Sequence, residues 1–383
     1  MVNLAGNRMF LFSKTNRFSS FGSLLAIMLL FLSCQGNSPE QAQKQQSNCQ
    51  YAKHFRLTSY DHYNKLEIIN PDDPEEISSY LLLPRGQKAP KGNHLPIIET
   101  PVNRAIVLSA TSIGMMAKLS ESTTISGVSS MEYVYDPLVK EAFKQGKIME
   151  VPSINQLNPE RVYRQAEILL YNGFGQKPAQ AQKLEQLGVH CLPIYDWREA
   201  HPLGKAEWII LFGALTDQLE AAQNYLQEIE EAYKGLIIQS KKLPKGPRLL
   251  SGSIYGDHWH MPAAESFNAE LYELAGANYK AYVKPGSGSA AYNLEEVLEG
   301  WRDVPVWINP QFKSKQEMLQ SNSKYAYFKA FQDGELYCYT HDPNRFWEYS
   351  AIEPHHVLSD LMQIIHRGKI PEKKLYFYRK ISE

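Results

Sequence analysis

The chain has 383 residues, with 40 Lys plus Arg against 41 Asp plus Glu, and 43% of its residues are hydrophobic. This composition is typical of a globular protein and excludes a disordered or collagen-like chain. The length predicts roughly two or three domains with a sizeable core. The formal net charge of -1 gives no reason to expect a nucleic-acid partner.

The first residues have the features of an export signal. Basic residues precede an apolar run, Leu24 to Leu32, that is too short to span a bilayer as a helix. The residues Phe31-Leu32-Ser33-Cys34 resemble the lipobox of bacterial lipoproteins, in which the signal is cut before a cysteine that becomes lipidated. We therefore expect a signal peptide at 1–33, lipidation of Cys34 and a lipidated tether at 34–50. The alternatives are a cleaved signal with an incidental cysteine and a transmembrane anchor.

Three cysteines remain, Cys49, Cys191 and Cys338. None has the C-x-x-C spacing of a zinc or redox motif, and an odd number excludes a fully paired disulfide framework. We expect isolated thiols in the core or on the surface.

Residues 51–100 form a predicted β-rich extension. Apolar and polar residues alternate from His54 to Ile69 and again from Ile77 to Leu83, and a turn-forming stretch, Asn70 to Pro74, separates the two. This pattern indicates an antiparallel hairpin. A loop rich in Pro, Gly and Lys follows, from Pro84 to Asn93.

Residues 101–204 show repeated strand and helix patterns. Short apolar runs predict strands at 105–108, 125–128, 168–171 and 191–195, and helical patterns extend to Leu119, from Pro159 to Ala166 and from Ala179 to Leu187. Alternation of this kind indicates a parallel α/β sheet, the first of two lobes.

The strongest periodic signal lies in the linking segment 205–243. Apolar residues from Leu215 to Leu236 recur at alternating steps of four and three, with charged residues on the other face. This predicts one amphipathic helix from about Asp217 to Lys241, about 40 Å long. A coiled-coil dimer has the same spacing, but only about three heptads are present, so we expect a monomer.

Residues 244–383 form the predicted second lobe, with strands at 248–254, 304–308 and 335–339 and helices at 268–275, 294–299 and 355–367. One motif occurs in both lobes: Asn158-Pro159-Glu160 and Asn293-Leu294-Glu295 each place an asparagine cap before a short helix with Glu in its first turn, and a strand follows. The predicted fold class is therefore α/β, with two similar lobes, one long connecting helix and a ligand cleft between the lobes.

Candidate binding residues follow the predicted strands. Ligands of open α/β sheets bind beyond the carboxyl ends of the strands, aromatic rings offer flat apolar area, and Arg pairs with carboxylate or phosphate. Each candidate has an alternative role, as a core ring or a solvated loop charge. The candidates are Ser109, Asn172, Trp197, Arg198, Tyr255, His258, Trp259, Arg345 and Trp347.

Asp257-His258-Trp259-His260 is the one metal-like cluster in the sequence. In an extended segment His258 and His260 lie on one side, where they can hold a transition metal or an axial position of haem or cobalamin. No Cys or third His has suitable spacing nearby, so we expect no closed zinc site and assign no metal ligands. His355 and His356 are expected to form a surface pair at a helix start. An exported hydrolase with a nonstandard site is the competing class, although the sequence contains no hydrolase or phosphate-loop motif.

Two lobes joined by one helix behind a lipoprotein signal resemble the helical-backbone class of periplasmic binding proteins, the substrate receptors of iron–siderophore, haem and cobalamin ABC importers. The resemblance covers about residues 100–368 and rests on 158–173, 188–190, 199–208, 346–348, 354 and 357–361.

This resemblance implies several properties of the chain. It implies a non-enzymatic receptor without a cofactor, tethered to the membrane on the periplasmic side, that captures an iron complex (siderophore or haem) and delivers it to an ABC permease; a corrinoid is the alternative ligand. Receptors of the class use one surface Glu per lobe to meet Arg on the permease, and the matching residues are Glu160 and Glu295. The alternative for both is stabilisation of a helix N-terminus.

Overall fold

The computed structural model describes residues 46–47, 49–155, 157–175 and 177–383, which belong to one compact unit. The predicted signal peptide and Cys34 lie outside these residues. Among the described residues, Cys49, Cys191 and Cys338 form no disulfide.

The N-terminal extension is a five-stranded sheet in the order β1-β2-β3-β4-β5. Its strands are β1 (Gln46–Ser47), β2 (Phe55–Ser59), β3 (Asn64–Ile69), β4 (Ile77–Pro84) and β5 (Ile97–Thr100). The expected single strand from His54 to Ile69 is in fact two strands, because Tyr60 N–H donates to the Tyr63 carbonyl at 2.9 Å and closes a turn. The β4–β5 pair is parallel, and the other pairs are antiparallel.

The N-terminal lobe contains a parallel sheet in the order β10-β9-β6-β7-β8. The strand and helix patterns predicted for this lobe are confirmed. The elements are β6 (Ala105–Val107), α1 (Ala110–Lys118), β7 (Ile125–Val128), α2 (Pro137–Lys144), β8 (Met149–Glu150), α3 (Pro159–Gln165), β9 (Ile168–Asn172), α4 (Ala179–Gln186) and β10 (His190–Ile194), with short 3-10 helices η1 (Ser122–Thr124), η2 (Met131–Tyr133) and η3 (Asp196–Arg198).

The extension shares its hydrophobic core with this lobe. Phe55 and Leu66 from the five-stranded sheet belong to the same buried cluster as Val107 and Leu170 from the parallel sheet. The opposite face of the parallel sheet is covered by α3 and α4, whose Val162 and Leu184 lie in a second cluster. Residues 51–100 therefore complete the core of the lobe on one face.

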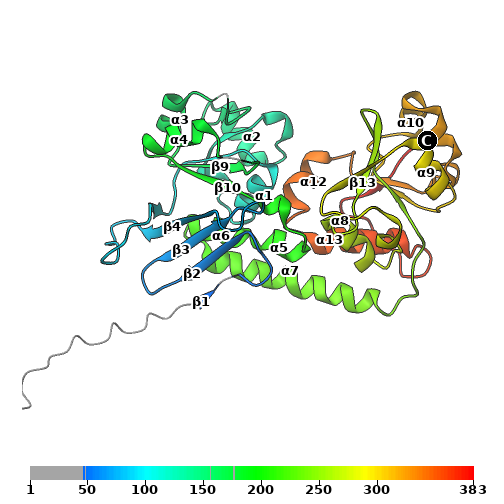
Figure 1. Ribbon diagram of the computed structural model, residues 1–383, viewed down its shortest axis with the longest axis horizontal. Coiled ribbons are helices and arrows are strands. Elements are labelled where there is room, and N and C mark those ends of the chain that lie inside the picture. The colour runs from blue at the N-terminus through cyan, green and yellow to red at the C-terminus, as the bar shows by residue number, and fades with distance from the viewer. Residues whose placement is uncertain (1–45, 48, 156, 176) are drawn as a thin grey trace, which may run out of the picture. The chain divides into compact units, whose positions relative to one another are not determined.

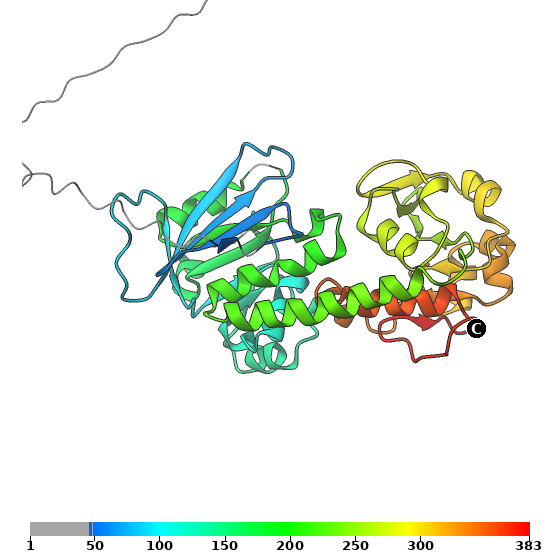
Figure 2. The same cartoon turned by 90° about the horizontal axis from the view of Figure 1, so that it is seen from below.

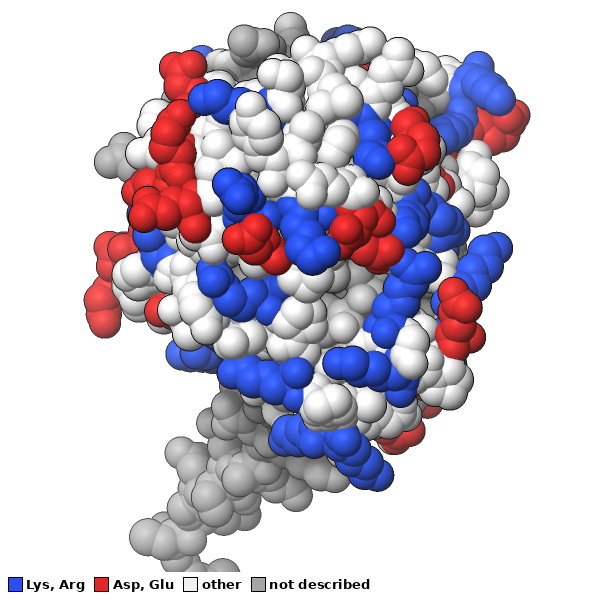
Figure 3. All heavy atoms as spheres, turned by 90° about the vertical axis from the view of Figure 1, so that its right-hand side faces the viewer, with Lys and Arg blue, Asp and Glu red and all other residues white. Residues whose placement is uncertain are grey.

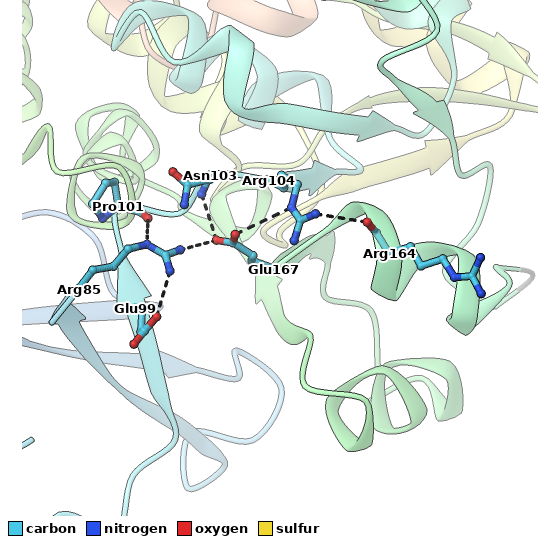
Figure 4. A network of polar contacts seen from close by, with 7 residues as sticks. All are labelled: Arg85, Glu99, Pro101, Asn103, Arg104, Arg164 and Glu167. Carbon is cyan, nitrogen blue, oxygen red and sulfur yellow. Dashed lines mark hydrogen bonds and ion pairs between the residues drawn. The ribbon is translucent and has the colours of Figure 1, made fainter.

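A polar network joins the two sheets at their edge (Figure 4). The Arg85 guanidinium pairs with Glu167 at 2.7 Å and with Glu99 at 2.9 Å, and it donates to the Pro101 carbonyl at 3.1 Å. Glu167 also accepts the Asn103 N–H at 3.1 Å.

Three helices lie between the two lobes in the sequence: α5 (Pro202–Glu207), α6 (Ile209–Leu215) and α7 (Leu219–Ser240). The long helix α7 (green in Figures 1 and 2) has 22 residues and matches the predicted helix closely. Between α6 and α7, Asp217 adopts a positive φ of 61°. A Cβ on Gly213 would lie 2.8 Å from the Gln218 carbonyl oxygen, so the close approach of the two helices requires glycine there.

The C-terminal lobe has two sheets. One has the order β11-β15-β16-β17 and the other β12-β13-β14. The strands are β11 (Leu250–Ser251), β12 (Ser253–Tyr255), β13 (His258–Pro262), β14 (Ser289–Tyr292), β15 (Trp307–Ile308), β16 (Leu336–Cys338) and β17 (Arg379–Lys380); the helices are α8 (Phe267–Leu274), η4 (Lys280–Tyr282), α9 (Leu294–Trp301), α10 (Lys315–Ser321), η5 (Ser323–Tyr327), α11 (Lys329–Gln332), α12 (Pro343–Tyr349) and α13 (Pro354–Ile365).

The expected strand at 248–254 divides at Gly252. This glycine has a φ of 76°, and a Cβ there would lie 1.8 Å from the His260 carbonyl oxygen. The chain turns at this point and joins the second, antiparallel sheet. The predicted fold class is confirmed: two α/β lobes joined by one long helix.

Candidate functional site

A cavity of about 360 Å³ lies at the carboxyl ends of the parallel strands of the N-terminal lobe. Four of the five strands, β6, β7, β9 and β10, contribute through the residues that follow or end them, as expected for an open α/β sheet. Trp347 is supplied by α12 of the C-terminal lobe. The lining residues are Leu108, Ser109, Ala110, Thr111, Ser129, Tyr133, Asn172, Asp196, Trp197, Lys205 and Trp347.

Three aromatic rings are exposed in this cavity. The exposed fractions are 56% for Tyr133, 39% for Trp197 and 52% for Trp347. Trp197 is supported by the Phe174 ring at 4.7 Å, and Trp347 packs edge-on against the Tyr339 ring at 5.5 Å. The supporting rings hold the tryptophans in place, so the cavity offers flat apolar surfaces to a ligand.

The charged residues that line the cavity are Asp196 and Lys205. Asp196 begins η3 and is only 2% exposed. Burial raises the pKa of its carboxyl group, whereas the Lys205 charge and a hydrogen bond with the Thr111 side chain lower it. Its Oδ2 atom has no hydrogen-bond partner among the described residues. A buried acceptor of this kind favours a ligand that brings a hydrogen-bond donor.

Contacts between α12 and the N-terminal lobe bring Trp347 to the cavity. The Glu348 carboxylate is fully buried and accepts the backbone N–H groups of Tyr135 and Asp136. Asn344 Nδ2 donates to the Glu132 carbonyl at 2.7 Å. A Cβ on Gly114 of α1 would lie 2.0 Å from the Glu348 carbonyl oxygen, so glycine is needed for this contact. Residues of both lobes therefore build one cavity.

The structure brings four of the nine predicted binding residues together, Ser109, Asn172, Trp197 and Trp347. The two arginines do not line the cavity, because each has a partner within the protein. Arg198 pairs with Asp72 of the extension at 2.8 Å. Arg345 donates to the Tyr376 carbonyl at 3.0 Å and stacks over the Tyr376 ring at 4.2 Å.

The prediction for Trp259 is wrong, because this ring is fully buried in the core of the C-terminal lobe. Its Nε1 donates to the Ser251 carbonyl at 2.9 Å, and its ring packs against Trp307 at 5.1 Å. Tyr255 and His258 are exposed on the β12–β13 hairpin and do not line the cavity. Alternation along β13 decides this outcome, because neighbouring side chains of a strand point to opposite faces.

The described residues contain no group of three or more His, Cys, Asp or Glu side chains suited to hold a metal ion. His355 and His356 form the expected pair at the start of α13, with ring centroids 4.0 Å apart, but they are not fully exposed. Both side chains are partly buried, and the His356 ring stacks on Tyr376 at 3.8 Å.

Seven lining residues were not among the candidates, and three of these carry a ring or a charge: Tyr133, Asp196 and Lys205. Asp196 follows β10 closely, and Tyr133 ends η2 beyond the end of β7, so both positions met the strand-end criterion applied to the other candidates. Lys205 lies on α5, and no local sequence signal places a helix residue at this cavity.

A larger cavity of about 740 Å³ lies at the other edge of the parallel sheet, beside Arg85, Arg104 and Glu167. It adjoins the starts of β9 and β10. Its Arg85 is already paired with two carboxylates (Figure 4). Position and charge pairing therefore favour the smaller cavity as the binding site.

Both predicted docking carboxylates are exposed near helix starts. Glu160 lies in the first turn of α3, which Asn158 caps by accepting the Arg161 N–H at 2.9 Å. Glu295 lies in the first turn of α9 and pairs with Lys324 at 3.3 Å. The carboxylate that completes the capping box of α9 is that of Glu296. The Glu295 carboxylate therefore does not take part in the capping box.

Solved structures of binding proteins have a similar fold. A periplasmic binding protein from Veillonella parvula is 14% identical, with a TM-score of 0.57 over 80% of this chain and 99% of that one. A periplasmic haem binding protein from Pseudomonas aeruginosa is 16% identical (TM-score 0.54; 74% and 99% coverage). The periplasmic vitamin B12 binding protein BtuF of Vibrio cholerae is 14% identical (TM-score 0.52; 69% and 97% coverage). The chain thus has the fold of the periplasmic binding proteins for iron, haem and vitamin B12.

Two proteins of Methanocaldococcus jannaschii are similar over most of their length. The uncharacterized lipoprotein MJ0878 is 25% identical over 331 residues, which is 83% of this chain and 76% of that protein. The uncharacterized lipoprotein MJ0872 is 23% identical over 350 residues, 87% of this chain and 86% of that protein. No family model matches the chain. In the described part of the chain, no helix is long and apolar enough to cross a membrane.

Proposed function

We propose that this protein is the substrate-binding lipoprotein of an ABC importer, anchored through Cys34 to the cell envelope on the periplasmic side. In this function it captures a metal complex between its lobes and delivers the complex to a permease. The observation that carries the proposal is the cavity at the strand ends, where rings from both lobes surround neutral polar groups. The fold shared with binding proteins and the names of the two lipoprotein relatives support it.

The charges of the cavity narrow the class of ligand. Arg198 and Arg345 are engaged with protein groups, which leaves Lys205 as the cation that lines the cavity. Neutralising a highly charged siderophore would require several cations close to the ligand. The rings and the opposite charges of Lys205 and Asp196 instead suit a flat macrocycle of low net charge. Among iron complexes we therefore favour haem over a polyanionic siderophore, and a corrinoid is the alternative.

Tryptophan fluorescence and calorimetry can test this proposal, because Trp197 and Trp347 lie in the cavity. We expect saturable, sub-micromolar binding of haemin or cyanocobalamin, without turnover, and weaker binding of a ferric catecholate siderophore. Failure of all three to bind, or turnover of an ester or glycoside substrate, would contradict the proposal.

A single substitution tests the cavity itself. Trp347→Ala removes one ring and should weaken binding of the preferred ligand roughly tenfold, because an aromatic contact contributes about 1 kcal/mol beyond the area it buries. Tyr163→Ala is the matched control, since Tyr163 is equally exposed at 52% but lines the larger cavity. If the control weakened binding as much as Trp347→Ala, the ligand would not occupy the proposed cavity.

A further inference from the structure

Six lysines gather around the C-terminal end of α7. Lys241, Lys242 and Lys245 follow the helix, and Lys369, Lys373 and Lys374 follow α13. All six are exposed, and none forms an ion pair with a carboxylate in the described part of the chain. Figure 3 views this end of the molecule, and Lys and Arg side chains crowd the lower half of the face with few carboxylates among them.

Contacts between the two segments make these lysines one surface. A Cβ on Gly276 would lie 2.5 Å from His366 Nε2 and 3.6 Å from Ser240 Oγ, so the end of α7 and the end of α13 flank the same glycine. Gly246 approaches the Ile365 side chain equally closely. Leu243 and Ile370 pack against the same hydrophobic cluster. We call the six lysines the lysine patch.

The local charge is strongly positive. Residues 241–245 and 367–374 contain one acidic residue, Glu372, against the six lysines and Arg367. Arg367 pairs with Glu335, whereas the lysines are left to solvent. Since the whole chain has a net charge of only -1, this excess is a local feature that attracts a polyanion.

An apolar side chain adjoins the lysine patch. Ile238 is 57% exposed and lies three and four residues before Lys241 and Lys242, on the same face of the helical turn. Exposed isoleucine among lysines suits the boundary between headgroups and acyl chains of a bilayer. Residues 238–245 and 367–374 contain no Phe, Tyr or Trp, which disfavours single-stranded nucleic acid, because its bases bind by stacking on rings.

We propose that the lysine patch binds the anionic phospholipid surface of the membrane to which the protein is tethered. This contact is separate from ligand capture and draws on the proposed function only for the lipid anchor, which keeps the chain near a bilayer. Clusters of four to eight basic residues are the usual feature of such surfaces, and attraction falls away within a Debye length. The contact would hold the C-terminal lobe at the membrane without a second lipid.

The test uses the mature chain without its lipid, sedimented with vesicles of phosphatidylcholine alone or with about one third phosphatidylglycerol. We expect the protein to bind the vesicles that contain phosphatidylglycerol and not those of pure phosphatidylcholine, and we expect high salt to reverse the binding. The triple variant Lys241→Gln, Lys242→Gln, Lys369→Gln should bind on the order of 100-fold more weakly, because each basic residue near an anionic surface contributes about a fivefold gain in affinity. Ile238→Ser should bind more weakly than the unsubstituted protein as well.

The matched control is Lys88→Gln, Lys91→Gln, Lys147→Gln, which removes three exposed lysines of the N-terminal half. Its vesicle binding should match that of the unsubstituted protein. If the control loses as much vesicle binding as the patch variant, the effect is one of net charge and the proposal is overturned. Tighter binding to a DNA oligonucleotide than to vesicles would overturn it as well. Ligand titration separates the two proposals. No residue of the lysine patch lines the cavity, so the patch variant should bind ligand as the unsubstituted protein does. If ligand binding is lost in every variant, the result counts against the receptor function and not against the membrane contact.

Discussion

At the residue scale, Glu348 links the two lobes through one buried carboxyl group. Burial raises its pKa to about 7, and the nearby Asp136 carboxylate adds to the rise. The N–H donors of Tyr135 and Asp136 and the charge of Lys140 act in the opposite direction. Because the pKa is higher in the folded protein than the ordinary value of 4.5, protonation of this group favours folding.

The pH dependence of stability follows from this shift. The contribution of Glu348 is fully present below pH 4.5, decreases as the pH rises and is lost above about pH 7. The total change is roughly 3 kcal/mol of unfolding free energy. Glu348→Gln cannot ionise, so it should remove this part of the pH dependence. Denaturant unfolding of both proteins between pH 5 and pH 8 measures the difference; parallel pH profiles would show that Glu348 does not titrate in this range.

At the element scale, two buried carboxylates fix the segment that leads into β2. Glu207 accepts the backbone N–H groups of Gln50, Tyr51 and Ala52 at 2.6 to 2.7 Å. Glu199 accepts those of Lys53 and His54 at 3.0 Å and the Trp208 indole N–H at 3.2 Å. Side chains of α5 and of the loop before it therefore accept the backbone hydrogen bonds of a segment that does not pair with a strand.

We expect Glu207→Gln to destabilise the protein by about 3 kcal/mol, because the amide group places an N–H donor where two backbone N–H groups need an acceptor. Unfolding in denaturant gives this value, and amide exchange at Gln50 to Ala52 should accelerate. Glu220→Gln, at an exposed position of α7, is the control and should change stability by less than about 0.5 kcal/mol. Similar effects of the two substitutions would mean that the segment is held by packing.

At the scale of the whole molecule, the proposed importer function requires a docking surface on each lobe. Glu160→Ala combined with Glu295→Ala should leave ligand affinity unchanged and reduce uptake in cells, because both carboxylates are exposed and neither lines the cavity. Individual exposed ion pairs contribute about 1 kcal/mol or less, so the orientation of docking should suffer more than its affinity. The control pair is Glu141→Ala with Glu299→Ala. Normal uptake in the Glu160 and Glu295 double variant would exclude this docking surface.

The proposed lipid anchor gives a second prediction at this scale. Cys34→Ser should abolish incorporation of a radiolabelled fatty acid and move most of the protein into the soluble fraction. Any residual membrane association should be released by high salt, since the lysine patch would then be the remaining contact. Membrane association that resists high salt in this variant would show that another anchor exists.

The sequence by itself was enough for the local elements. Apolar periodicity and caps depend on neighbouring residues, so the strands of the N-terminal lobe, the helix α7 and the capped helices α3 and α9 were predicted close to their actual bounds. The strand-end rule found Ser109, Asn172 and Trp197 for the same reason: parallel strands end at one edge of their sheet. Trp347 was also named from the sequence, but it reaches the cavity on α12 through contacts between the lobes.

Tertiary structure decided what no local pattern contains. Trp259 was assigned to a cleft and lies in the core, because the pairing of β13 with β12 and β14 sets which face it occupies. Arg198 pairs with Asp72, and Arg345 donates to the Tyr376 carbonyl. Both partners are distant in the sequence, and they keep the two arginines from the ligand-binding role that was predicted. Lys205 entered the cavity because α5 packs beside it. Contacts between residues far apart in the chain depend on how the elements pack, and the periodicity of a single segment carries no information about that packing.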